Sequence, residues 1–113
     1  MHEYSLIQAL LARVETEAQA HRASSVSRLS VSIGELAGVE KSLFASAFDL
    51  CRCGTVCDGA ELELDYVEAR WACRVCGRTV ARGEVLSCPD CGSPARLLTG
   101  DEIVLNRIEM EVA

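Results

Sequence analysis

The sequence is poor in aromatic residues and has no long apolar run. Two phenylalanines, two tyrosines and one tryptophan are the only aromatic side chains in 113 residues, so the core must be built mostly from Leu, Val, Ile and Ala. No segment approaches the roughly 18 to 20 apolar residues that cross a bilayer, and no basic stretch before an apolar run marks a leader peptide. We therefore expect a cytoplasmic protein with a modest core.

Catalytic and nucleic-acid-binding motifs are also missing. The chain has two histidines, no Ser-His-Asp set and no phosphate-binding glycine loop, so we expect no enzymatic activity. The net charge of −6 argues against general affinity for nucleic acid or for an anionic membrane. Residues 70–99 are an exception, with five arginines against two acids. We interpret this segment as a docking surface for an acidic partner, formed by Arg70, Arg74, Arg78 and Arg82.

Seven cysteines are the most informative residues present. In a reducing compartment they indicate metal binding or reactive thiols before disulfides. Four of them form two C-x2-C pairs in CRVCGRTVARGEVLSCPDCG: Cys73, Cys76, Cys88 and Cys91. This spacing predicts a zinc ribbon, in which four thiolates close a tetrahedron around a structural Zn(II) ion. Two disulfides or a thioredoxin-like redox pair are the alternatives. A zinc hydrolase is disfavoured, because four thiolates leave no open position.

The remaining cysteines lie in the segment CRCGTVC, as Cys51, Cys53 and Cys57. A C-x-C-x3-C cluster could hold a soft metal ion. A simpler interpretation places Cys51 in the core, on a helix face, and leaves Cys53 and Cys57 as loop thiols.

Apolar periodicity predicts two helices and three strands. Three- and four-residue spacing predicts helices from Tyr4 to about His21 and over residues 43–51, and alternation predicts strands in RLSVSIGEL, AELELDYVEA and EIVLNRIEMEV. The fold class is therefore α+β, with a small sheet of about three strands packed by two helices. Residues 1–69 and 100–113 form one α/β domain, and residues 70–99 form an inserted four-cysteine module that hangs from two adjacent strands and can tilt.

The opening residues MHE have the donors for a second metal site. The Met1 amine, the deprotonated His2 amide and the His2 imidazole form two fused chelate rings, and the Glu3 amide could supply a fourth nitrogen. Four such nitrogens favour a square plane, which suits Ni(II) or Cu(II) better than Zn(II). A simpler alternative is that His2 is a polar residue leading into the helix, with Glu3 favouring its positive end.

Taken in order, these features resemble the HypA/HybF family of hydrogenase nickel-insertion accessory proteins. The features are MHE before an amphipathic helix, the segment SIGELAGVEKSLFASAF, a strand, a four-cysteine ribbon and an acidic closing strand. The resemblance runs the full length of the chain. It implies a cytosolic metallochaperone that delivers Ni(II) to an apo [NiFe]-hydrogenase large subunit, together with a nickel-handling GTPase. Some family members also supply urease, so urease accessory proteins are further expected partners.

The resemblance also implies roles for particular residues. His2 matches the nickel ligand of the family, with Met1 and Glu3 beside it, and the four ribbon cysteines match its zinc ligands. Glu40 stands where the family often has an acidic residue near the nickel site, so it is an auxiliary candidate. This ribbon contains no histidine, which puts in doubt the histidine exchange at zinc that has been proposed for some members. The alternative function is a zinc-ribbon adapter or regulator that binds protein or nucleic acid.

Overall fold

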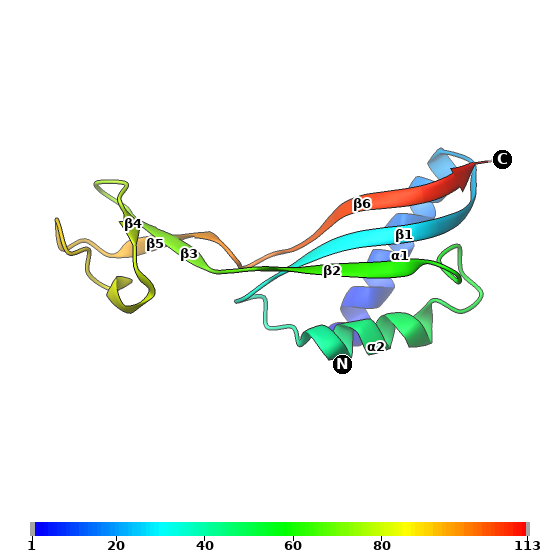
Figure 1. Cartoon of the computed structure of the whole chain (residues 1–113), viewed down its shortest axis with the longest axis horizontal. Coiled ribbons are helices and arrows are strands. Elements are labelled where there is room, and N and C mark those ends of the chain that lie inside the picture. Colours follow the sequence, from blue (N-terminus) through cyan, green and yellow to red (C-terminus); the bar gives the residue numbers. More distant parts are fainter. Residues whose placement is uncertain (1, 113) are drawn as a thin grey trace.

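The structure, a computed structural model, describes the backbone of residues 2–112 and the side chains of residues 3–112. The molecule is elongated, with principal extents of 57 × 27 × 17 Å. Two small sheets lie toward its opposite ends and are joined by a narrow connection (Figure 1). Among the described residues, no helix is long and apolar enough to cross a bilayer.

The first sheet and both α-helices are formed by residues 2–67 and 103–112. Its strands are β1 (Ala23–Gly34), β2 (Glu61–Val67) and β6 (Ile103–Val112), in the order β2-β1-β6. Strand β1 pairs with β2 in parallel and with β6 antiparallel. The helices are α1 (His2–Ala20) and α2 (Lys41–Cys51). The predicted sheet of three strands packed by two helices is confirmed.

The core lies between the helices and one face of the first sheet. Alternate residues of β1, among them Leu29, Val31 and Ile33, are buried. They pack with Ile7 and Val14 of α1 and with two phenylalanines of α2, Phe44 and Phe48. Alternation on the strand and three- to four-residue spacing on the helices put these side chains on facing surfaces. Those two rings are the aromatic members of a core that otherwise consists of aliphatic side chains and Cys57.

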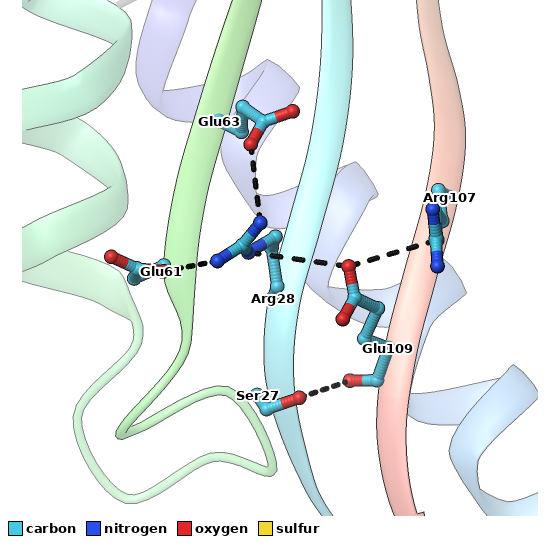
Figure 2. A network of polar contacts seen from close by, with 6 residues as sticks. All are labelled: Ser27, Arg28, Glu61, Glu63, Arg107 and Glu109. Atoms are coloured by element: carbon cyan, nitrogen blue, oxygen red, sulfur yellow. Dashed lines mark hydrogen bonds and ion pairs between the residues drawn. The ribbon is translucent and has the colours of Figure 1, made fainter.

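The opposite face of the first sheet is polar. Arg28 of β1 stands between acidic side chains from both neighbouring strands (Figure 2). Its guanidinium lies 3.0 Å from Glu61 and 3.5 Å from Glu63, both on β2, and 4.0 Å from Glu109 on β6. Arg107 contacts the same Glu109 carboxylate at 3.6 Å. Each of these exposed ion pairs contributes little to the free energy of unfolding. Together they favour the observed strand order, because they link all three strands.

The second sheet is formed within residues 70–99. It consists of β3 (Arg70–Cys73), β4 (Thr79–Val80) and β5 (Ala95–Thr99) in the order β4-β3-β5, with a 3-10 turn, η1 (Arg82–Glu84). Strand β3 follows β2, and β5 precedes β6. The expectation that the module hangs from adjacent strands is wrong, because β1 lies between β2 and β6. The division into two domains stays a prediction.

Candidate metal centres

Two turns of the same form carry the four clustered cysteines. In the first, the N–H of Cys73 donates to the carbonyl oxygen of Arg78 at 2.8 Å, and the N–H of Gly77 donates back to the carbonyl oxygen of Cys73 at 3.1 Å. The second turn, from Cys88 to Ser93, repeats both bonds at 2.8 Å. Each turn thus folds its two cysteines onto one side of a closed backbone loop.

A glycine makes each of these turns possible. Gly77 has a φ of 73° and Gly92 has a φ of 76°. Residues with a Cβ rarely adopt this left-handed conformation, whereas glycine does so at no steric cost. The C-x2-C-G pattern in the sequence therefore encodes the turn as well as the spacing of the two sulfurs.

The four sulfurs form a compact group. All four Sγ atoms lie within 4.8 Å of one another. Three of the distances are 3.2 Å for Cys73 to Cys91, 3.8 Å for Cys76 to Cys88 and 4.0 Å for Cys76 to Cys91. Zn–S bonds of about 2.3 Å in a tetrahedron require S···S edges of roughly 3.8 Å. The arrangement fits a tetrahedral thiolate-bound ion, and it is the one such cluster of metal-binding side chains found within the described residues.

Backbone N–H groups favour the thiolate form of the two buried cysteines. The N–H groups of Cys76 and Val75 lower the pKa of Cys73, and the Val75 nitrogen lies 3.4 Å from the Cys73 sulfur. The equivalent N–H groups in the second turn, those of Cys91 and Asp90, lower the pKa of Cys88. These donors suit a sulfur that carries negative charge, as a metal-bound thiolate does.

The exposed Cys76 behaves differently. The N–H of Arg78 favours its thiolate, but the thiol of Cys73, burial and the two other sulfurs outweigh that bond and raise the pKa of Cys76 to about 11. Four thiolates cannot coexist at this separation without a cation between them. Metal binding at this cluster should therefore release protons and weaken as pH falls.

The second sheet has a very small apolar core. Its buried residues are Cys73, Val80 and Cys88, with Trp71 and Ala95 packed against them. Two of these three buried side chains are members of the sulfur cluster. A bound metal would therefore supply folding free energy that this segment cannot obtain from apolar burial.

The predicted nickel site is only partly within the described residues. Met1 and the side chain of His2 lie outside them. The side chain of Glu3 is described: it is 9% exposed, and its Oε2 accepts a hydrogen bond from the backbone N–H of Glu40 at 3.4 Å. The backbone of Glu40 therefore lies beside the first turn of α1, and its auxiliary role at nickel stays a prediction.

The carboxylate of Glu40 is engaged locally, because Glu40 caps α2. Its Oε2 accepts bonds from the Ser42 hydroxyl at 2.6 Å and from the Leu43 N–H at 2.9 Å, and its Oε1 accepts from the Ser42 N–H at 3.3 Å. These bonds, led by that from the Ser42 hydroxyl, lower the pKa of Glu40. To ligate a metal, Glu40 would have to give up part of its capping role.

The segment CRCGTVC does not gather its sulfurs. Cys57 is fully buried, Cys51 is half-buried and Cys53 is exposed. Cys57 lies in the loop between α2 and β2, as the simpler interpretation expected, but its side chain is part of the main core. Burial, with the charge of Glu15 as the smaller cause, raises the pKa of Cys57 to about 11.

The proposed arginine docking surface is partly used within the molecule. Arg82 binds Glu35 at 2.6 Å, Arg78 lies 3.3 Å from Asp90, and Arg70 lies 3.8 Å from Glu68. The docking role of this surface stays a prediction, with three of its four arginines paired to carboxylates. Sequence reasoning missed Glu35, and no motif could have shown it, because its partner lies 47 positions away.

Comparison with known proteins decides the family. The family model described as "Hydrogenase/urease nickel incorporation, metallochaperone, hypA" matches residues 1–110. The chain belongs to the HypA family. The family is one of metallochaperones for hydrogenase and urease maturation, in agreement with the resemblance noted from the sequence.

Individual HypA proteins match over their full lengths. The hydrogenase maturation factor HypA of Aquifex aeolicus (strain VF5) is 38% identical, with 99% of each chain covered. The HypA of Shewanella baltica (strain OS195) is 34% identical over 98% of this chain and 97% of its own. The solution structure of the Ni metallochaperone HypA from Helicobacter pylori is 30% identical, covers 98% of both chains and superposes with a TM-score of 0.76.

Proposed function

We propose that this protein binds Ni(II) at its N-terminus and passes it to an apo [NiFe]-hydrogenase large subunit in the cytoplasm. The observation that carries the proposal is the match to the nickel-incorporation family from residue 1 to residue 110, because it includes the MHE tripeptide. The ligands would be the Met1 amine, the His2 amide and imidazole, and the Glu3 amide. Glu40 is the auxiliary candidate.

The position of Glu3 supports this ligand set. Its backbone belongs to the first turn of α1, while its side chain is anchored on Glu40. The anchor holds the third residue of the tripeptide and leaves the two preceding residues at the very end of the chain. Donors at a chain end can be replaced one at a time by thiolates of a recipient, because no closed cage has to open. Such a site suits transfer better than storage.

We assign a structural Zn(II) ion to Cys73, Cys76, Cys88 and Cys91. When bound, it supplies the positive charge that keeps all four thiols deprotonated and holds the two turns together. The soft thiolate set and tetrahedral spacing suit zinc, whereas the nitrogen donors at the N-terminus suit nickel. In this division the ribbon has a structural role and no catalytic one. The protein is a nickel carrier that acts with a nickel-handling GTPase and, for urease clients, with urease accessory proteins.

A nickel titration of the zinc-loaded protein tests the proposal. Calorimetry and visible absorption would compare the native chain, a chain with one glycine added before Met1, and the substitutions His2→Ala and His21→Ala. His21 is the matched control, because it is the other histidine and its Nδ1 lies 2.9 Å from the carbonyl oxygen of Glu17 at the far end of α1.

The expected result is tight binding of one nickel per chain only by the native form and by His21→Ala, with the spectrum of a square-planar site. Equal binding by all four forms would show that nickel binds elsewhere in the protein and that the N-terminal assignment is wrong. A second assay, transfer of nickel from the loaded protein to an apo large subunit, tests delivery. Retention of nickel by the carrier in that assay would contradict the metallochaperone role.

A further inference from the structure

The waist between the two sheets is formed by three chain segments. The turn after β1, Gly34 to Leu36, lies between the two connections that lead into and out of the four-cysteine module. Its N–H groups donate to both: Gly34 to Glu102 at 2.9 Å, Glu35 to Val67 at 2.8 Å, and Leu36 to Gly100 at 2.6 Å. The turn is therefore a wedge held on both sides by backbone hydrogen bonds.

The wedge is tightly packed. A Cβ added at Gly34 would lie 2.4 Å from the carbonyl carbon of Gly100, and one added at Gly100 would lie 2.5 Å from the Cα of Ala69. Real Cβ atoms do not approach backbone so closely, so these three segments touch through their main chains. The waist has no intervening side chains at these points.

Glu35 projects from this wedge and joins two parts of the module. Its Oε1 accepts from the Ala69 N–H at 2.9 Å and from the Arg82 guanidinium at 2.7 Å, and its Oε2 contacts the same guanidinium at 2.6 Å. Ala69 lies directly before β3, whereas Arg82 begins the turn η1 beyond β4. One carboxylate therefore binds both the entry to the module and its interior, and the pair with Arg82 is bidentate.

Arg82 links Glu35 to the core around the sulfur cluster through Trp71. Its guanidinium lies over the ring of Trp71, 5.3 Å from the centroid. Trp71 in turn packs against the small core that contains Cys73 and Cys88. The stack on the indole orients the guanidinium, so fewer conformations are lost when it binds Glu35.

A second ion pair of the module does not cross the waist. Arg78 lies 3.3 Å from Asp90, and both residues belong to residues 70–99. It joins the two cysteine turns to each other. Arg70 pairs at 3.8 Å with Glu68, which lies in the connection just before the module. The carboxylate of Glu35 instead comes from the turn directly after β1.

We propose that Glu35 and Arg82 form a positioning pair that fixes the orientation of the four-cysteine module relative to the first sheet. The pair acts together with the backbone hydrogen bonds of the waist, because it joins the turn after β1 to η1 inside the module. The proposal does not depend on the nickel site, since it concerns only the arrangement of the two sheets. It differs from the expectation that the module is attached only by its two ends and can tilt.

Residual dipolar couplings of backbone amides in the zinc-loaded full chain test the proposal, because they report the relative orientation and mobility of the two sheets. The variants are Glu35→Gln, Arg82→Gln and the charge reversal Glu35→Arg with Arg82→Glu. Glu35→Gln keeps an oxygen for the Ala69 N–H and removes only the charge. Asp90→Asn is the matched control, because it breaks the pair that lies within the module.

In the native protein and in Asp90→Asn, one alignment tensor should fit both sheets. In each single variant, the couplings of residues 70–99 should shrink relative to those of β1, and the charge reversal should restore them in part. Zinc content and amide shifts within each sheet should stay unchanged. A common tensor in Glu35→Gln and Arg82→Gln would overturn the proposal, as would an equal loss in Asp90→Asn or no recovery in the charge reversal.

Discussion

The carboxylate of Glu3 lies against the backbone N–H of Glu40, although the two residues are 37 positions apart. Glu3 belongs to the first turn of α1, and Glu40 caps α2, so the contact joins the beginnings of the two helices. A carboxylate at this place also meets the positive ends of both helix dipoles. The first turn of α1 at Glu3 is thereby held beside the start of α2.

The contact between Glu3 and Glu40 predicts a stability effect at Glu3. Glu3→Ala removes the acceptor from a side chain that is 9% exposed, and we expect a loss of about 1 kcal/mol in the free energy of unfolding. Glu3→Gln retains an amide oxygen and should lose less. Urea unfolding followed by far-UV circular dichroism measures both. Equal stability of Glu3→Ala and the native chain would show that the contact contributes nothing.

Local pattern was enough to predict the elements of the first sheet. Leu29, Val31 and Ile33 alternate in the sequence, and burial follows that alternation. The cysteine turns were predictable for the same reason, because Gly77 follows its C-x2-C pair directly and lies where a positive φ is needed. Each of these predictions depends on residues a few positions apart.

Contacts between distant segments could not be predicted in this way. Cys57 lies in the loop after α2, but this loop folds back on β1, where the N–H of Val26 donates to the carbonyl oxygen of Val56 at 2.9 Å, and the Cys57 side chain enters the core. The partner of Glu35 is set by the path of the chain through the waist, not by any spacing. The placement of β1 between β2 and β6 is likewise a property of the sheet as a whole.

The two carboxylates with lowered pKa values predict a loss of stability in acid. The Arg82 guanidinium lowers the pKa of Glu35, and the Ser42 hydroxyl lowers that of Glu40. Each folded-state pKa lies below its unfolded value, so the stabilisation is present above the unfolded pKa of about 4.3 and is lost as pH falls through the folded pKa. Denaturant unfolding at a series of pH values measures the slope.

Glu40→Gln and Glu35→Gln provide the comparison for this acid effect. Each variant removes one titrating group, so its free energy of unfolding should depend less on pH in that window than that of the native chain. Glu61→Gln is a suitable control, because its exposed carboxylate pairs with the exposed Arg28 guanidinium at 3.0 Å, and such surface pairs contribute little to stability. Parallel pH profiles for the native chain and both test variants would contradict the prediction.

Removal of the metal should unfold the four-cysteine module and spare the first sheet. The small core of the second sheet is built on Cys73, Val80 and Cys88, whereas the first sheet shares a larger core with both helices. Treatment with a strong chelator should collapse the amide signals of residues 70–99 in a nitrogen-15 correlation spectrum and leave those of β1 in place. Cys76→Ser should have the same effect, and Cys53→Ser should not. Loss of the amide signals of both sheets together would contradict the prediction that the first sheet stays folded without the metal.

The close approach at Gly100 predicts a strong effect of a single methyl group. Gly100 has a φ of 102°, and an added Cβ would meet the Cα of Ala69 at 2.5 Å. We expect Gly100→Ala to cost about 1 to 3 kcal/mol of stability, because backbone strain and a backbone clash act together. Gly83→Ala is the control, since nothing lies within 4 Å of its added Cβ. Equal unfolding midpoints for the two variants would refute the packing of the waist.

The three cysteines outside the ribbon should differ in their reactivity toward a thiol reagent. Cys53 is exposed, and Cys57 is fully buried with its pKa raised to about 11. Since the thiolate is the reactive form, Cys53 should react first in the native zinc-loaded protein at about pH 8, and Cys57 should react only when the protein opens. Mass spectrometry of peptides after timed alkylation measures the order, and addition of urea should abolish the difference.

The same raised pKa makes Cys57 a source of alkaline instability. Its folded-state pKa lies above the unfolded value, so the neutral thiol stabilises the fold below the unfolded pKa, and this contribution is lost as pH rises toward 11. Cys57→Ala should remove that alkaline dependence while lowering stability at neutral pH, because it leaves a small cavity in the core. Cys53→Ala should change neither. The burial of Cys57 underlies both this prediction and the timed alkylation. Alkylation of Cys57 as fast as Cys53 in the folded protein would therefore contradict both, because it would show that the loop from residue 52 to residue 60 does not cover the core.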